Sequence, residues 1–364
     1  MKNPSKLKQI EAFKEICKQE IEKSNQELGI DLAIMPMTII EYYDSDVFKN
    51  KTKLKRKEHK LLLKNATGYY NPKGIYVFID NVIKSIKSQS PNPLIDILIT
   101  AHHEYRHQLQ YQSKGISEYE KALISVERKI IMLKPNDYDK RHDQYFLEFD
   151  AELYAIAKTK EYFKTNYPDA FDIIEKYIDH QYLSRIQIEQ LKYDVQALFD
   201  LLYEECTKKK IHLNYFKDPL FQIFYNKDNK YKPLNEIINS DFLKNIDTRI
   251  IEGILGSYTF LEQLDMSKLT LNEKLFMLNV IDNVIKDKED RFNKLEELYQ
   301  QQTTRTKEYF ASFKGIIKKL QYLDEKYTNM YNSILDIKSQ KSTLIHYERL
   351  KMIQKQLYTA TKTK

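Results

Sequence analysis

A helical segment with recognisable ends constrains the fold of this chain more than any other feature. Asn92 suits the cap that precedes a helix, Pro93 suits its first position, and Gly115 suits the turn that follows its end. These signals predict a helix over residues 93–114. The chain has only 7 glycines and 9 prolines among 364 residues, so long helices with few tight turns are expected elsewhere as well.

The predicted helix contains the sequence HEYRH, which places His103 and His107 four residues apart. Residues at that spacing share one helix face and lie about 6 Å apart, so both imidazoles can bind one zinc ion, each through a nitrogen about 2.0–2.1 Å from the metal. Glu104 lies about 100° further round the helix. Its carboxylate is expected to act as a general base on a water whose pKa zinc has lowered to about 7.

A third protein ligand is expected on a later helix, because a catalytic zinc site combines three protein ligands with one open position. The sequence EFDAELYA lies in a helix predicted over residues 143–165 and begins with Glu148, the preferred third ligand. Asp150 and His142 are the alternatives for that role. Glu152 lies one turn after Glu148 and can accept the second ring N–H of a ligating histidine, which fixes the tautomer of that ring.

The segments around these motifs predict an α+β fold. Two aromatic and β-branched runs in residues 66–83 flank a turn over residues 71–74 and predict a β-hairpin. Apolar spacing predicts further helices, and a β-branched run predicts one more strand. These helices span residues 4–28 and 118–133, and the strand spans residues 37–43.

From about residue 170 the pattern is helical throughout. Thr270 and Glu273 form a capping box at the start of a long apolar stripe. The stripe covers residues 278–299 and 313–337 and is interrupted at residues 301–307. This pattern predicts a helical bundle, or two long helices folded as an antiparallel, coiled-coil-like hairpin.

Taken together, the motifs of residues 30–165 resemble those of the HExxH zincin metallopeptidases of the gluzincin type, whose third ligand is a glutamate on a later helix. EFDAELYA is similar to the glutamate helix of that family, with Glu148 at the ligand position and Glu152 at the following acidic position. The small intracellular members, including the ImmA/IrrE-like peptidases, have a strand or hairpin before the HExxH helix, and GYYNPKGIYVFID matches that arrangement. Arg106 stands where the family usually has an uncharged residue.

The resemblance implies a small zincin-like metallopeptidase domain over residues 1–168, in which a helix, a short antiparallel sheet, the HExxH helix and the glutamate helix follow one another. A helical linker or bundle is expected over residues 169–265, and the long-helix region over residues 266–364. The implied activity is hydrolysis of peptide bonds in a peptide or protein substrate, with Zn²⁺ as the cofactor. An extended substrate could pair with the strand at residues 75–80.

The donor that stabilises the oxyanion of the tetrahedral intermediate is left open by the sequence. His102 faces about 100° away from His103 and is expected to pack or to face substrate rather than to bind metal. The candidates for the oxyanion donor are Tyr154, Tyr145, His142 and Arg106.

A second hypothesis assigns the function of the protein to its C-terminal helical region. The zincin-like fold would then be a catalytically silent binding or regulatory module, with self-association or a protein partner docking on the C-terminal helices. A basic run at residues 49–60 could contact nucleic acid, but a net charge of +7 from 59 basic and 52 acidic residues does not establish such a partner. No apolar run reaches about 18 residues, and Cys17 and Cys206 form no disulfide framework, so a cytoplasmic protein with no membrane partner is expected.

Overall fold

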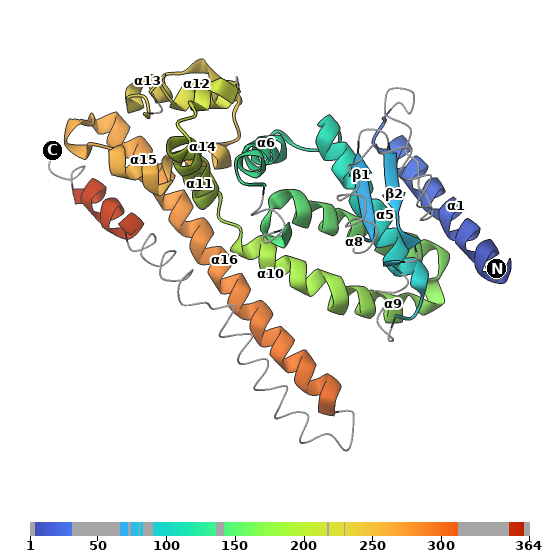
Figure 1. Cartoon of the computed structure of the whole chain (residues 1–364). Helices are drawn as coiled ribbons and strands as arrows, with labels where there is room; N and C mark the ends of the chain where they lie inside the picture. The colour runs from blue at the N-terminus through green and yellow to red at the C-terminus, as the bar shows by residue number, and fades with distance from the viewer. Residues whose placement is uncertain are drawn as a thin grey trace. The chain divides into compact units, whose positions relative to one another are not determined.

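The computed structural model describes residues 4–30, 66–71, 74–79, 81–82, 90–135, 142–216, 218–228, 230–311 and 349–359. Over these ranges the chain is mostly helical, with a short two-stranded antiparallel sheet, which is compatible with the expected α+β class (Figure 1). The predicted strand at residues 37–43 and the basic run at residues 49–60 lie outside the described residues. Among the residues that are described, no helix is both long enough and apolar enough to cross a membrane.

The chain divides into two compact units. The first comprises residues 1–127 and 136–190, and the second comprises residues 128–135 and 191–364. The three-part division expected from the sequence stays a prediction. All the residues predicted to form the metal site lie in the first unit.

The first unit is built around α5 (Pro93–Gln112), which packs against a β-hairpin, against α1 (Pro4–Glu27) and most extensively against α8 (Phe146–Asn166) (Figure 1). The remaining elements of this unit complete it in chain order. They are β1 (Gly68–Asn71), β2 (Gly74–Val77), the first part of α6 (Glu118–Leu133), 3-10 turns at His142–Gln144 and Pro168–Ala170, α9 (Phe171–Ile178), a π-helical turn at Asp179–Leu183 and the start of α10 (Ser184–Lys192).

The start of α5 is formed as the sequence predicts. Asn92 Oδ1 accepts a hydrogen bond from the backbone N–H of Leu94 at 3.0 Å, and Pro93 takes the first position. The end comes earlier than expected. The last helical residue is Gln112, and Ser113 adopts the left-handed conformation, with φ 55°, that closes the helix. Gly115 also has positive φ, at 58°, but it lies beyond the helix and allows the chain to turn back towards α6.

The hairpin predicted within residues 66–83 is confirmed. Asn71 pairs with Gly74 next to the turn, and Gly68 pairs with Val77 at the open end. β2 is buried along its whole length, whereas β1 is half-buried. Both strands pack against α5, so the hairpin covers one side of the helix that carries the HEYRH motif.

A buried carboxylate ties the start of α5 to the π-helical turn. Asp96 is only 6% exposed and lies in the first turn of α5. It accepts hydrogen bonds from the hydroxyls of Ser90 at 2.9 Å, of Tyr177 at 3.2 Å and of Tyr182. Three hydroxyl donors compensate for the lost hydration of this acid.

The described residues of the second unit are mostly helical, with one isolated antiparallel β-bridge between Tyr225 and Tyr231. The capping box predicted at the start of α16 (Leu271–Ala311) is present, because Thr270 N–H donates to Glu273 Oε2 at 2.7 Å and Glu273 N–H donates to Thr270 Oγ1 at 3.4 Å. The other elements are α11 (Val195–Lys208), α12 (Pro219–Phe224), α13 (Leu234–Ile238), α14 (Thr248–Leu255), α15 (Tyr258–Gln263), 3-10 turns at Leu213–Phe216, Asp241–Asn245 and Met266–Lys268, and a helix at 349–359.

The apolar stripe is interrupted at residues 301–307, but α16 runs through them without a break to Ala311. The glutamines and threonines there end the apolar stripe but contain no glycine or proline to end the helix. The helix at 349–359 lies against α16, since Gln354 Nε2 donates to Asp282 Oδ1 at 2.8 Å. Residues 312–348, which include the whole second part of the predicted stripe at 313–337, lie outside the described residues.

Candidate metal centre

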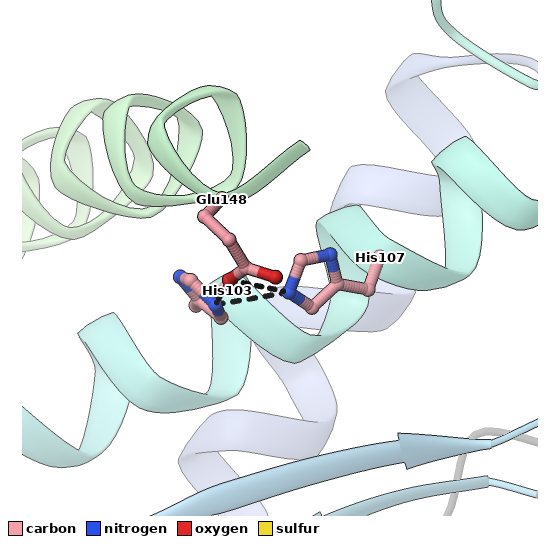
Figure 2. Close-up of side chains that lie close together, drawn as sticks. All are labelled: His103, His107 and Glu148. Carbon is pink, nitrogen blue, oxygen red and sulfur yellow. Dashed lines mark hydrogen bonds and ion pairs between the residues drawn. The ribbon is translucent and has the colours of Figure 1, made fainter. Parts of the chain in front are cut away.

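Three side chains from two helices converge on one point in the first unit. His103 and His107 project from successive turns of α5, and Glu148 projects towards them from the first turn of α8 (Figure 2). The two Nε2 atoms are 3.0 Å apart, and each lies 3.4 Å from Glu148 Oε2. The cluster is partly shielded, because Glu148 is buried and both histidines are half-buried.

These spacings fit a tetrahedral zinc site. Ligand atoms at two corners of a tetrahedron, each with a bond of about 2.0–2.1 Å to the metal, lie about 3.3–3.4 Å apart. The three measured separations of 3.0, 3.4 and 3.4 Å are close to that value. Two imidazole nitrogens and one carboxylate oxygen are also the donor set that zinc accepts. His103, His107 and Glu148 could therefore hold a metal ion.

The Nδ1 atom of each histidine faces a hydrogen-bond acceptor, which indicates that both rings carry a proton on Nδ1. His103 Nδ1 lies 3.1 Å from Glu152 Oε2, and His107 Nδ1 lies 2.9 Å from Gln110 Oε1. A proton on each Nδ1 leaves the two Nε2 lone pairs facing one another across 3.0 Å. Two lone pairs and a carboxylate oxygen repel one another unless a cation or a proton lies between them, so the cluster is electrostatically suited to a cation.

The charges within the cluster reinforce this preference. Burial raises the pKa of Glu148, but the charge of His107 and contacts with both histidines outweigh that effect and hold it well below its usual range. Burial lowers the pKa of His103, but contacts with Glu148 and Glu152 raise it well above its usual value. Glu148 is therefore ionised, and the position between the rings favours positive charge.

Glu104 lies beside the cluster, under the hairpin. Its side chain is 9% exposed, and burial raises its pKa although His103 and His107 oppose the rise. The neighbouring strand has no side chain at the point of closest approach, because a β-carbon at Gly68 would lie 2.4 Å from Glu104 Oε1. The hairpin backbone thus confines the Glu104 carboxylate next to the two histidines.

A buried acid that sequence analysis overlooked holds the first turn of α8. Glu127 of α6 is fully buried and accepts hydrogen bonds from the backbone N–H groups of Phe146 at 2.7 Å and Leu147 at 3.0 Å. Tyr145, at the cap position of α8, makes no side-chain cap. Glu127 therefore replaces a local cap and fixes the turn from which Glu148 projects. Nothing in the sequence near Glu127 distinguishes it from an ordinary helical acid.

The alternative ligand Asp150 faces away from the cluster. Its carboxylate accepts hydrogen bonds from Arg106 Nε at 2.8 Å and Arg106 Nη2 at 3.1 Å. Gln110 Nε2 donates to the same carboxylate at 2.7 Å. This pairing also explains how Arg106, only 6% exposed, is accommodated where the family resembled usually has an uncharged residue. Its charge is compensated on α8 rather than directed at the cluster.

The candidates for an oxyanion donor occupy different surroundings. The Tyr154 ring lies over Arg106 and near Tyr105, on a different side of α5 from the two Nε2 atoms. Tyr145 is buried at the start of α8. The side chain of His142 is 46% exposed, and its Nε2 lies 3.1 Å from Glu148 Oε2. Of these side chains, His142 is the accessible one beside the candidate metal site.

His102 packs in the core, in agreement with its expected separation from the ligands. Its side chain is fully buried, and the ring makes an edge-to-face contact with Tyr154 at 6.4 Å. Burial, followed by the charge of Lys158, lowers the pKa of His102 to about 3, so the ring is neutral. His102 takes no part in the cluster.

Comparison of the chain with protein-family models, with curated proteins and with solved structures gives no match.

Proposed function

We propose that the protein is a zinc-dependent metallopeptidase of the HExxH, gluzincin type, with His103, His107 and Glu148 as the ligands of Zn²⁺. The observation that carries this proposal is the convergence of two Nε2 atoms and one carboxylate oxygen at separations of 3.0, 3.4 and 3.4 Å, beside a buried glutamate. The resemblance of HEYRH and EFDAELYA to the gluzincin motifs supports the same assignment.

When bound, zinc polarises the scissile carbonyl and makes a water molecule nucleophilic at neutral pH. Glu104 takes the proton from that water and passes it to the leaving amine. Burial supports both steps, because it raises the pKa of the Glu104 carboxyl towards the range in which a group can accept and then release a proton. Gly68 keeps the hairpin backbone close enough to exclude bulk water from this carboxylate.

We assign the stabilisation of the carbonyl oxygen to His142. Its exposed imidazole lies beside Glu148, whereas Tyr145 is buried at the start of α8 and Tyr154 is half-buried against Arg106 and Tyr105. A neutral or charged imidazole can donate a hydrogen bond to developing negative charge on the substrate. Tyr145 instead contributes to the packing at the start of α8.

The strand that binds an extended substrate is proposed to be β1 instead of residues 75–80. Residues 75–79 are buried, so their side chains are not accessible to a peptide. β1 is half-buried, and Gly68 brings it against the general base. A peptide that follows β1 would pass the Glu104 carboxylate directly, which is the geometry that hydrolysis requires.

The test compares zinc content and hydrolysis in the same set of variants. We expect the wild type to retain zinc after dialysis and His107→Ala to lose it, whereas His212→Ala, which removes an exposed histidine of the second unit, retains it. Glu104→Gln should keep the metal and lose cleavage of a peptide library read by mass spectrometry. A wild-type protein that holds no zinc, or a Glu104→Gln variant that still cleaves, would overturn the proposal. Zinc binding without cleavage in the wild type would favour a binding module.

A further inference from the structure

Gln110 is a buried amide with a complete set of partners next to a ligand histidine. It lies one turn after His107 on α5 and is 1% exposed. Its Oε1 lies 2.9 Å from His107 Nδ1, and its Nε2 donates to the backbone carbonyl of Leu147 at 2.9 Å and to Asp150 Oδ2 at 2.7 Å.

The partners of Gln110 determine which way its amide faces. Both N–H bonds of the amide point at atoms that only accept, namely the Leu147 carbonyl oxygen and the Asp150 carboxylate. The amide oxygen must therefore be the atom that faces His107. An amide oxygen accepts but does not donate, so the contact requires a proton on His107 Nδ1.

Asp150 is held in turn, which prevents the amide from rotating. Arg106 makes two hydrogen bonds with the Asp150 carboxylate and a third with the Gly115 carbonyl oxygen at 2.8 Å. Arg106 and Asp150 are both largely shielded from solvent, so screening by water is weak. The order of contacts is Arg106, Asp150, Gln110 and His107, and each contact fixes the orientation of the next side chain.

We infer that Gln110, locked by Asp150 and the Leu147 carbonyl, is a positioning residue that holds His107 as its Nδ1–H tautomer and so presents Nε2 to the metal. This inference rests on the proposed metal site. Gln110 differs from Glu152, the partner of His103, in having no charge. The two ligand histidines are therefore supported unequally, and His107 is the weaker donor of the two because a neutral acceptor polarises the ring less.

The experiment measures zinc affinity and the His107 tautomer separately. Gln110→Met keeps the length of the side chain and removes all three hydrogen bonds. The matched control is Gln112→Met, because Gln112 lies on the same helix and is half-buried. Competition with a chromophoric chelator should show zinc affinity reduced by about 10-fold or more in Gln110→Met, as for other partners of ligand histidines, and unchanged in Gln112→Met.

Nuclear magnetic resonance of the ring nitrogens, in the metal-free protein at mildly alkaline pH, reads the tautomer without any zinc chemistry. The wild type should show His107 protonated at Nδ1, and Gln110→Met should show a mixture of tautomers. Wild-type His107 protonated at Nε2, or a Gln110→Met variant with unchanged tautomer and affinity, would overturn the inference. A wild type without zinc affinity but with the Nδ1–H tautomer would instead overturn the proposed function alone.

Discussion

Gly68 in β1 lies directly against the carboxylate of Glu104 in α5. A β-carbon at Gly68 would come within 2.4 Å of Glu104 Oε1 and 2.6 Å of Cγ, distances that real β-carbons do not show. Glu104 is buried, so its carboxylate has little room to move aside. The role proposed for Glu104 therefore depends on a neighbouring residue that has no side chain.

Gly68→Ala should lower kcat by about 100-fold while zinc affinity stays the same. The added methyl group displaces the general base, and a misplacement of about 1 Å costs that much. The three atoms nearest to the added carbon all belong to Glu104 and not to a proposed ligand. The control is Thr67→Ala, which alters the preceding residue without adding a group beside Glu104. Full activity of Gly68→Ala would mean that Glu104 is not the base, or that it does not act from this position.

Glu148→Gln and Glu152→Gln should reduce zinc affinity to different degrees. Glu148→Gln removes the anionic ligand itself and should cause the larger loss of zinc affinity. In Glu152→Gln an amide oxygen still accepts from His103 Nδ1, so zinc affinity should fall by about 10-fold. Glu161→Gln, on the exposed face of the same helix, serves as the control. Chelator competition measures all three. The reverse order would contradict Glu148 as the third ligand.

Glu127→Gln should destabilise the metal-free protein by about 1–3 kcal/mol, because the first turn of α8 loses one of its two buried acceptors. Zinc affinity should fall as well, since Glu148 projects from that turn. Urea denaturation measures the free energy of unfolding, and Glu118→Gln, 77% exposed on the same α6 helix, is the control. Equal stability of the two variants would show that Glu127 does not act as the cap of α8.

The stability of the protein should fall at alkaline pH through Cys17. Burial, with a smaller effect of Glu20, raises the pKa of this thiol to about 12. A thiol in the unfolded chain titrates near about 8.5, so the folded protein holds the proton more tightly. The stability that the neutral Cys17 thiol contributes is complete while the pH is below the pKa of the unfolded chain. It is lost as the pH rises from there towards the pKa of the folded protein, because in that interval only the unfolded chain ionises.

Cys17→Ala should remove this part of the pH dependence. The comparison is the free energy of unfolding from urea denaturation, for wild type and variant, at neutral pH and at a pH of about 10. Cys206, whose pKa burial raises to about 11, is present in both proteins and cancels from the difference. A difference between wild type and variant that is the same at both pH values would contradict the prediction.

The sequence was informative wherever a property is set by residues close together in the chain. The start of α5 at Pro93 follows from Asn92, and the hairpin follows from its turn between Asn71 and Gly74. The meeting of His103 and His107 with Glu148 followed from spacing on two helices together with a resemblance, and the structure places the three side chains together.

Other features depend on how helices pack and could not be predicted from local patterns. The support of His107 by Gln110 needs α5 and α8 in register, because Asp150 and the Leu147 carbonyl come from α8. Glu127 caps a helix that starts far along the chain. The apolar stripe is interrupted at residues 301–307 while α16 continues, because a change of polarity along a helix is not a change of backbone conformation.

The π-helical turn helps to anchor α5, the helix that carries His103 and His107. Tyr177 and Tyr182 are five residues apart, and in a regular α-helix such residues would face directions about 140° apart. The wider winding at Asp179–Leu183 brings both hydroxyls to the single carboxylate of Asp96. Deletion of one residue there would leave the tyrosines four residues apart, only about 40° apart in a regular α-helix, so the π-helical turn accommodates one extra residue while both hydroxyls keep the same acceptor.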